Sequence, residues 1–356
     1  MRKLLVVVGL ALLLATAGCA DLVDDGDGIT DDEPVDDSED RADGDSETTT
    51  DGDTEPTAVE GNLEIHHIDV GQADSTLIIT PTADTILVDT GDWRQDGADV
   101  IAYLDELGIE RIDHLVATHA HADHIGGHAA IIETFETERD GIGTAYDSGV
   151  PHTSATYDNY LDAIEDHDVE LLVVEEGDEL PLDDDDLVAR VLNPPAGESG
   201  DDLHENSVSL AFEFGEFSYL TTGDAERDAE ERMVAEWAET LDATVYQAGH
   251  HGSSTSSTAP FLDEVSPEIA VVSSDYDSQY GHPHDETLQA FAERGIETYW
   301  TGVHGDIVVT TNGTTVEVTT EAEFSSDPEA LLAEKHDETQ IVGADIIDLA
   351  VAPIPG

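Results

Sequence analysis

The sequence is poor in cysteine and in positively charged residues, and each shortage excludes certain kinds of site. Cys19 is the only cysteine among 356 residues, which excludes a disulfide within the chain and a metal site built from several thiolates. Only 11 Lys and Arg residues stand against 84 Asp and Glu residues, giving a formal net charge of -73. A long basic groove for a nucleic-acid backbone is therefore excluded.

The excess of acidic residues is spread through segments that are otherwise well patterned, and 39% of the residues are apolar. A chain of this length and composition can bury a core, so we interpret the charge as a surface property of a folded protein. Such a surface repels itself in dilute salt, whereas in molar salt the Debye length falls to about 3 Å and the repulsion is screened. The composition predicts a halophilic protein, with an acidic mesophilic protein as the alternative.

Long hydrophobic runs are also scarce. The apolar run 4–17 follows the basic start Met1-Arg2-Lys3 and is shorter than the roughly 20 residues that a membrane-spanning helix needs. Its length suits the hydrophobic segment of a signal peptide, and the small residues before Cys19 resemble a lipobox, in which the cysteine is acylated. We expect residues 1–19 to direct export, leaving the protein lipid-anchored through Cys19 on the outer face of the cell membrane, or secreted after cleavage near Ala17.

The remaining chain divides by composition. Residues 20–60 are almost free of apolar side chains and predict a disordered acidic linker, in which residues 24–32 faintly resemble a calcium-binding loop. Residues 61–320 predict one domain, and residues 321–356 an acidic C-terminal tail with one helix. Within the domain, hairpin-like strands come first and strands alternate with helices later, which predicts two sheets packed face to face with helices outside. Clear examples are a strand over 85–89, a helix over 98–107 and a hairpin over 305–318 that turns at Asn312-Gly313.

Nine of the sixteen histidines lie in two clusters, between residues 114 and 128 and between residues 250 and 284. The run His119-Ala120-His121-Ala122-Asp123-His124 offers three imidazoles and one carboxylate on a loop between a predicted strand and a predicted helix. In extended chain His119 and His121 point to the same side. We expect Asp123 and His124, farther along the loop, to point elsewhere, toward a second position. The run therefore predicts the two halves of a two-metal site with nitrogen and oxygen ligands.

This run, with Gly126-Gly127 behind it, resembles the signature of the metallo-β-lactamase superfamily. Three more segments match that family in order, namely Val88-Asp89-Thr90-Gly91, Thr222-Gly223-Asp224 and Gly249-His250-His251-Gly252-Ser253. Other segments are similar to the soluble hydrolase domain of the ComEC competence proteins, at residues 68–75, 146–149, 206–210, 250–253 and 280–284. The resemblance covers about residues 62–319, and no transmembrane channel domain of the ComEC kind is predicted, so we expect a stand-alone, exported version of that domain.

The resemblance implies a fold of the α/β class, a four-layer αββα sandwich, with two divalent metal ions, zinc or else manganese. Carried over residue by residue, it implies the metal ligands His119, His121, Asp123, His124, Asp224 (as the bridge) and His250. It leaves open whether His250 or His251 is the late ligand, and whether His152 or His204 supplies the family's middle histidine. Asp123, His251 and His282 are the implied catalytic residues, and Asp89 would orient a histidine of the first motif rather than bind metal. His66, His67, His114 and His128 are predicted to be structural.

The resemblance also implies hydrolysis by a hydroxide that bridges the two metals, without a serine or cysteine nucleophile. It favours a phosphodiesterase or nuclease that acts on extracellular DNA. The predicted domain has seven arginines and no lysine, so we expect DNA contacts to be weak and local, and we predict no stable protein partner. The alternatives are a hydrolase of a small ester, lactone or phosphoester and a non-catalytic metal-binding envelope protein.

Overall fold

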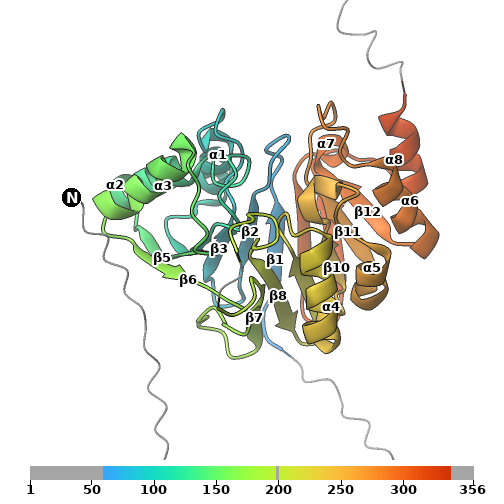
Figure 1. The fold of residues 1–356 in the computed structure, drawn as a ribbon, viewed down its shortest axis with the longest axis horizontal. Helices are drawn as coiled ribbons and strands as arrows, with labels where there is room; N and C mark the ends of the chain where they lie inside the picture. The colour runs from blue at the N-terminus through green and yellow to red at the C-terminus, as the bar shows by residue number, and fades with distance from the viewer. Residues whose placement is uncertain (1–58, 198–199, 338–356) are drawn as a thin grey trace, which may run out of the picture. The chain divides into compact units, whose positions relative to one another are not determined.

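The computed structural model describes residues 59–197 and 200–337. Within them, two β-sheets pack face to face and helices cover both outer surfaces (Figure 1). This is the predicted four-layer αββα arrangement. The predictions for the signal peptide, Cys19, the calcium-like segment 24–32 and most of the linker lie outside the described residues. None of the described helices has the length and apolar character that a membrane span requires.

The first sheet combines an antiparallel half and a parallel half. Its strands are β1 (Leu63–His67), β2 (Thr76–Ile79), β3 (Thr85–Val88), β4 (Ile112–Val116), β5 (Ile142–Asp147), β6 (Glu170–Val173), β13 (Ile307–Thr311) and β14 (Val316–Thr320). They are arranged in the order β14-β13-β1-β2-β3-β4-β5-β6. Neighbours are antiparallel from β14 to β3 and parallel from β3 to β6.

The second sheet repeats this plan. Its strands are β7 (Leu187–Asn193), β8 (Ser209–Phe214), β9 (Phe217–Thr221), β10 (Val245–Gln247), β11 (Ile269–Val272) and β12 (Glu297–Trp300). Their order is β12-β11-β10-β9-β8-β7, antiparallel from β7 to β9 and parallel from β9 to β12. In both sheets, then, a β-meander leads into parallel strands joined by helical connections.

Side chains alternate along each strand, so an apolar strand contributes to the core on both faces of its sheet. On β3, Ile86 and Val88 point into the core between the two sheets, whereas Leu87 points to the opposite face and packs under helices. All three side chains are at most 3% exposed. Successive side chains of a strand alternate between its faces, so a run of apolar residues suits a strand in the middle of four layers.

Helices on the two outer surfaces close the sandwich, as Figure 1 shows. The first sheet is covered by α1 (Ala98–Leu107), α2 (His128–Glu138) and α3 (Ala155–Asp166). The second is covered by α4 (Arg227–Leu241), α5 (Ala259–Val265), α6 (Asp285–Arg294) and α8 (Pro328–Lys335), and the short helix α7 (Thr301–His304) follows β12.

Helix α8 belongs to the predicted acidic tail, yet it packs on the domain. Its Leu331 is fully buried in the same cluster as side chains of α4, α5 and α6. Lys335 Nζ donates to the Pro283 carbonyl oxygen and to Asp285 Oδ1, both at 2.7 Å. The predicted boundary at residue 320 therefore separates from the domain a helix that contributes to its core.

Candidate metal centre

Four strand ends position the residues of the candidate site. β3 and β4 are parallel neighbours in the first sheet, and β9 and β10 are parallel neighbours in the second. The loops that leave their carboxyl ends carry Asp89, the segment 119–124, Asp224 and the pair His250-His251. Because the carboxyl ends of parallel strands share one edge of a sheet, residues far apart in the sequence meet there.

Three of these side chains, His119, His121 and Asp224, form a first cluster of possible ligands with His204 from the connection between β7 and β8. His121 Nδ1 lies 2.8 Å from His119 Nε2 and 3.1 Å from His204 Nε2. Asp224 Oδ2 lies 3.6 Å from His119 Nε2 and 3.9 Å from His204 Nε2. Ligands of a tetrahedral zinc ion, at about 2.0–2.1 Å from the metal, stand roughly 3.3 Å from one another. All four ligand atoms lie within 4.8 Å of one another, so they are close enough to surround one cation.

A second cluster comprises Asp74, His124, Asp224 and His251. Asp224 Oδ1 lies 3.2 Å from His124 Nε2 and 3.9 Å from His251 Nε2. These three atoms are buried and make no hydrogen bond within the described part of the chain. Unpaired buried polar atoms are costly, so their convergence indicates a place for a cation. Asp224 contributes one oxygen to each cluster, which is the bridging position predicted for it.

Asp123 lies beside the second cluster. Its Oδ2 is 3.5 Å from His251 Nε2, and its side chain is 32% exposed. The predicted ligands His119, His121, Asp123, His124 and Asp224 are thus brought together around two centres. Their ligation of metal stays a prediction, but the nitrogen and oxygen donors fit the two divalent ions.

His250 and His251 face different clusters. His251 is buried in the second cluster, whereas His250 Nε2 lies 3.5 Å from Asp224 Oδ2, the oxygen that faces the first cluster. They belong to a 3₁₀ turn (Gly249–Gly252) in which their φ angles are 51° and 56°. This left-handed conformation is uncommon for residues other than glycine, and strain of this kind gathers at functional sites. The geometry therefore brings His251 to the place for which the sequence favoured His250.

His204 joins the first cluster and answers the question of the middle histidine geometrically. Its ring centre lies 4.8 Å from that of His121, against 5.9 Å for the other candidate, His152. Its Nε2 also faces Asp224, as described above. The geometry therefore favours His204, on the connection between β7 and β8, over His152 as the middle histidine.

Carboxylates and carbonyls behind the imidazoles fix their orientation. Asp89 Oδ2 lies 2.7 Å from His124 Nδ1, and the same carboxylate accepts hydrogen bonds from the Thr118 backbone N (2.8 Å) and Oγ1 (2.7 Å). The predicted contact of Asp89 with a first-motif histidine is therefore present. His251 Nδ1 similarly faces the Ser273 carbonyl oxygen at 3.1 Å and Asp74 Oδ1 at 3.4 Å. Partners at Nδ1 place the ring proton there and leave Nε2 as the free ligand atom.

The electrostatics of the site favour a cation. Burial lowers the pKa of His119 well below its usual value and that of His121 to about 4, so both rings are neutral at pH 7 with a lone pair available. Burial acts in the same direction on His124, but the carboxylates of Asp224 and Asp89 outweigh it and raise its pKa well above the usual value. The negative field that would hold a proton on His124 also attracts a divalent cation.

His282, predicted to be catalytic, lies at the rim of the second cluster. Its ring stacks on that of His251 at 6.1 Å, and its Nδ1 lies 3.2 Å from Gln72 Nε2. Burial and the neighbouring His251 and His250 lower the pKa of His282 to about 3, so the ring is neutral at pH 7. All three predicted catalytic residues, Asp123, His251 and His282, therefore adjoin the site, and their roles stay predictions.

The histidines predicted to be structural lie in strands or helices beneath the loops and have partners of their own. His66 Nδ1 lies 2.9 Å from Tyr103 Oη, His114 Nδ1 lies 3.1 Å from Tyr146 Oη, and His128 Nδ1 lies 2.7 Å from Thr90 Oγ1. His67 is buried against Thr76 Oγ1 at 3.4 Å.

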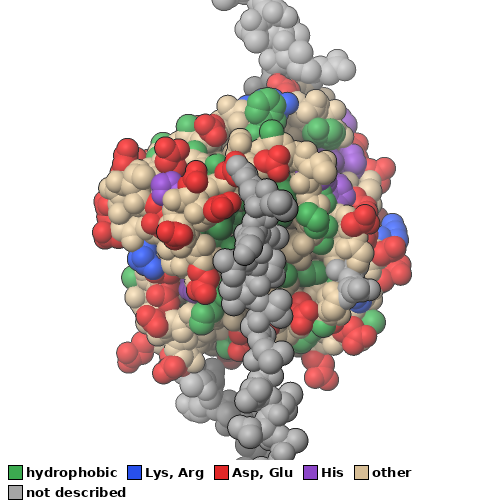
Figure 2. All heavy atoms as spheres, turned by 60° about the vertical axis from the view of Figure 1, so that its left-hand side comes forward, with side chains coloured by type: hydrophobic (Ala, Val, Ile, Leu, Met, Phe, Trp, Pro, Cys, Tyr) green, Lys and Arg blue, Asp and Glu red, His purple; other side chains and the backbone are tan. Residues whose placement is uncertain are grey.

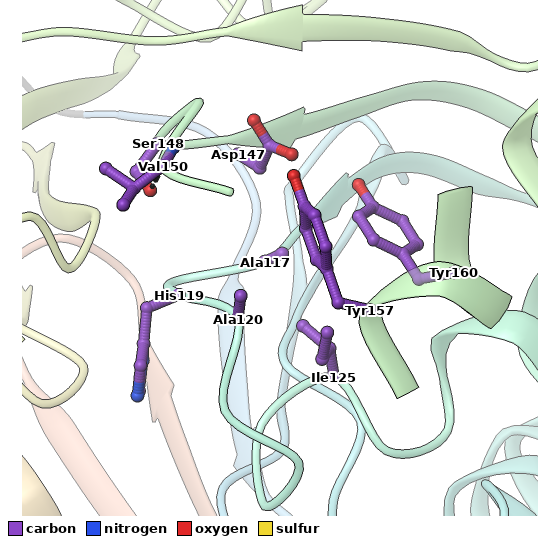
Figure 3. Close-up of a pocket in the computed structure, with 9 residues that line it drawn as sticks. All are labelled: Ala117, His119, Ala120, Ile125, Asp147, Ser148, Val150, Tyr157 and Tyr160. Carbon is purple, nitrogen blue, oxygen red and sulfur yellow. Dashed lines mark hydrogen bonds between the residues drawn. The ribbon is translucent and has the colours of Figure 1, made fainter. Parts of the chain in front are cut away.

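A small cavity lies behind His119. Its volume is about 10 Å³, the size of one water molecule, so it cannot hold a substrate. Figure 3 shows the hydroxyls of Tyr157 and Tyr160 pointing toward Asp147 in its wall, while the His119 ring points away from them. Burial raises the pKa of Asp147 to about 6. These residues support the loop of His119 from behind.

Sequence reasoning assigned no role to Asp74 or Glu226. Asp74 lies within the ComEC-like segment 68–75, so the resemblance pointed to its neighbourhood but not to its role. Glu226 follows Asp224 by two residues and lies 3.1 Å from His250 Nδ1 through Oε1. Among 84 acidic residues, nothing in its local sequence distinguishes it.

Comparison with known proteins identifies the family of the chain. The family model of the metallo-beta-lactamase superfamily matches residues 68–274. ComE operon protein 3 of Bacillus subtilis is 30% identical over 68% of this chain and 32% of its own length. Competence protein ComA of Neisseria gonorrhoeae is 30% identical over 67% of this chain and 30% of its own length. The chain thus spans about a third of the length of these relatives.

Among solved structures, the metallo-beta-lactamase fold protein YhfI from Bacillus subtilis aligns with 68% of this chain and 97% of its own, at 12% identity and a TM-score of 0.43.

Proposed function

This chain belongs to the metallo-β-lactamase superfamily, and we propose that it is a metal-dependent phosphodiesterase that cleaves DNA outside the cell. The observation that carries the proposal is the pair of nitrogen and oxygen clusters that share Asp224. The resemblance to the ComEC hydrolase domain and the relative named Competence protein ComA support DNA as the substrate, and the proposal concerns only the part of the relatives that this chain spans.

We propose that one divalent cation is held by His119, His121 and His204, and the other by Asp123, His124 and His251, with Asp224 shared. Zinc suits these imidazole-rich sets best, with manganese as the second choice. When bound, two such cations polarise a phosphoryl group and lower the pKa of water.

The protein's own residues supply orientation and proton handling. Neighbouring His251 and His124 oppose the effect of burial on Asp123 and hold its pKa below the usual value, so it is a carboxylate that accepts hydrogen bonds at the site. His282 accepts at Nδ1 from the Gln72 amide, which leaves its proton on Nε2. We propose that this N–H donates a hydrogen bond, without giving up its proton, to the phosphodiester or to the leaving oxygen.

Affinity for DNA has to come from somewhere other than positive charge. Figure 2 shows acidic side chains spread over the visible face with few Lys and Arg among them. Two exposed aromatic side chains adjoin the site instead. Trp93, 53% exposed, donates from its backbone N to the Ala122 carbonyl oxygen at 3.0 Å, and Tyr280, 60% exposed, lies 5.7 Å from His282 between ring centres. Stacking of a base on an aromatic ring contributes about 1–3 kcal/mol without any cation.

The experiment is a hydrolysis assay in molar KCl with Zn²⁺ or Mn²⁺, using single-stranded DNA, double-stranded DNA and bis-p-nitrophenyl phosphate. We expect the protein to cleave DNA, the Asp123→Ala variant to lose at least about a hundredfold in rate, and the exposed control Asp158→Ala to match the wild type. Cleavage of the small diester alone would favour a hydrolase of small esters or phosphoesters. Metal binding without any turnover would favour a non-catalytic envelope protein.

We further propose that the protein is exported and held at the membrane by a lipid on Cys19. Mass spectrometry of the N-terminal peptide tests the modification, and fractionation of cells that carry Cys19→Ser tests the anchor. Recovery of the variant in the medium and of the wild type with membranes is the expected result. Equal distribution of both forms would reject the anchor.

A further inference from the structure

Glu226 lies between two imidazoles on the outer side of the first cluster. It occupies the N-cap position of α4, but its side chain makes no capping hydrogen bond with the described residues. Instead, Oε1 lies 3.1 Å from His250 Nδ1 and 3.6 Å from His204 Nδ1. The three side chains are only 19–29% exposed.

Both imidazoles turn their other nitrogen toward the metal centre. His250 Nε2 lies 3.5 Å from Asp224 Oδ2, and His204 Nε2 lies 3.9 Å from the same oxygen. The ring centres are 4.6 Å apart, so one carboxylate can serve both rings. A neutral imidazole carries its proton on one nitrogen, and a carboxylate beside Nδ1 selects the form in which Nε2 is free.

Three other histidines of the centre have their own partners at the nitrogen that faces away from the clusters. His124 has Asp89 and His251 has the Ser273 carbonyl oxygen, as described above, and His119 Nδ1 lies 3.1 Å from Thr118 Oγ1. Glu226 occupies the corresponding place beside Nδ1 of His204. His250 has a second neighbour at Nδ1, because Thr255 Oγ1 lies 3.3 Å away. Loss of the carboxylate should therefore affect His204 more than His250.

We propose that Glu226 is a positioning residue of the metal centre, which holds His204 and His250 in the Nδ1–H form and directs both Nε2 atoms at the first cluster. The inference rests on the proposed metal centre but not on the identity of the substrate. It excludes one alternative use of the same atoms: a third cation bound by the two Nδ1 atoms and Oε1 would need both nitrogens without their protons.

Cobalt titration of the metal-free full-length protein in molar KCl tests the proposal. Absorption of bound Co²⁺ and competition with a chelator give the number and the affinity of sites. We expect two sites in the wild type, and in Glu226→Ala a loss of 10- to 100-fold at one of them with the other unchanged. Glu226→Gln keeps an acceptor oxygen without the charge and should fall between. Asp228→Asn removes an exposed charge from the same helical turn and should match the wild type.

A second measurement does not depend on metal. Long-range ¹⁵N NMR of the histidine rings should show His204 and His250 among the Nδ1–H rings of the wild type. In Glu226→Ala the proton of His204 should shift away from Nδ1 and that of His250 should shift less, whereas Asp228→Asn should leave both unchanged. Equal cobalt affinities in wild type and Glu226→Ala would overturn the proposal. A third equivalent of cobalt in the wild type that Glu226→Gln removes would also overturn it, since the cluster would then be a cation site.

The proposed phosphodiesterase activity can be refuted separately from the positioning role of Glu226. A wild type that binds two cobalt ions but cleaves no diester would refute the phosphodiesterase, while the difference between Glu226→Ala and wild type in cobalt affinity would still uphold the positioning role. A wild type that binds no metal would refute both.

Discussion

Replacement of Glu230 by glutamine should change the pH dependence of stability without touching the metal centre. Glu230 lies on α4, is fully buried, and its two carboxylate oxygens accept hydrogen bonds from the backbone N atoms of Ser257 (2.5 Å) and Thr258 (2.9 Å). Those groups lead into the N-terminus of α5. Burial nevertheless raises the pKa of Glu230 to about 7, against an ordinary value of 4.5.

The direction of the effect follows from linkage. A carboxyl whose pKa is higher in the folded state favours folding when it is protonated, so its contribution is full below about pH 4.5 and is lost as the pH rises through about 7. The difference of about 2.5 between the two pKa values corresponds to about 3 kcal/mol at 1.36 kcal/mol for each pH unit. Glutamine does not titrate, but its amide NH₂ faces one backbone N–H, which costs about 1 kcal/mol or more.

The assay is chemical or thermal unfolding of wild type and Glu230→Gln in molar KCl at pH 4.5, 6 and 8. Taking the difference between the two proteins at each pH cancels the titration of the other acidic residues. The variant should be less stable at pH 4.5 by about 1–2 kcal/mol and should gain about 3 kcal/mol relative to the wild type by pH 8. A difference that stays constant over this range would refute the assignment of the raised pKa to Glu230.

The remaining predictions concern the surface, the site and its rim. Unfolding temperature should rise steadily with KCl from 0.1 to about 3 M because screening relieves the repulsion of acidic side chains; a flat profile would reject the halophilic interpretation. Asp89→Asn should weaken one of the two cobalt sites about 10- to 100-fold, because an amide has one acceptor oxygen and cannot accept from His124 Nδ1 on one side and the Thr118 backbone N on the other; unchanged titration curves would contradict this. Trp93→Ala and Tyr280→Ala should each raise KM for single-stranded DNA about 5- to 100-fold and leave the methyl diester of phosphate unaffected, whereas the exposed control Phe324→Ala should do neither. Finally, KM for DNA should not increase with salt as it does for proteins that bind phosphates through Lys and Arg. A steep loss of affinity between about 0.1 and about 1 M KCl would show that such contacts exist.

Elements with strong local patterns were predictable from the sequence, and elements defined by distant neighbours were not. The helix over 98–107 is α1, and the hairpin turns at Asn312-Gly313 between β13 and β14. β5 (Ile142–Asp147) was missed, because Gly143 and Thr144 interrupt its apolar residues and its parallel neighbours β4 and β6 come from separate parts of the chain. α3 was missed because its buried face is only Tyr157, Tyr160 and Ile164 among acidic residues.

The candidate site shows the same division. The run from His119 to His124 is local, and its side chains meet around two centres as its spacing predicts. The choice between His250 and His251 was not readable, because an extended chain sends neighbours to opposite sides whereas both residues here adopt a left-handed turn. His204 was equally undetermined, since the connection between β7 and β8 brings it to a site that is otherwise built from other strand ends.

Three aspartates that face imidazoles of the candidate site share deep burial, which their charge alone does not reveal. Asp74, Asp89 and Asp224 are each at most 4% exposed, and each faces an imidazole nitrogen. Desolvation of an ionised carboxylate costs several kcal/mol, so such residues persist where hydrogen bonds and a nearby cation offset that cost. Composition cannot reveal this, because 84 acidic residues carry the same charge. The position of an aspartate relative to the strands does reveal it, because Asp89 lies in the loop after β3 and Asp224 in the loop after β9. In an acidic sequence, an aspartate in the loop that leaves an apolar strand is therefore a better candidate for the site, as a ligand or as the partner of a ligand, than one in an acidic run.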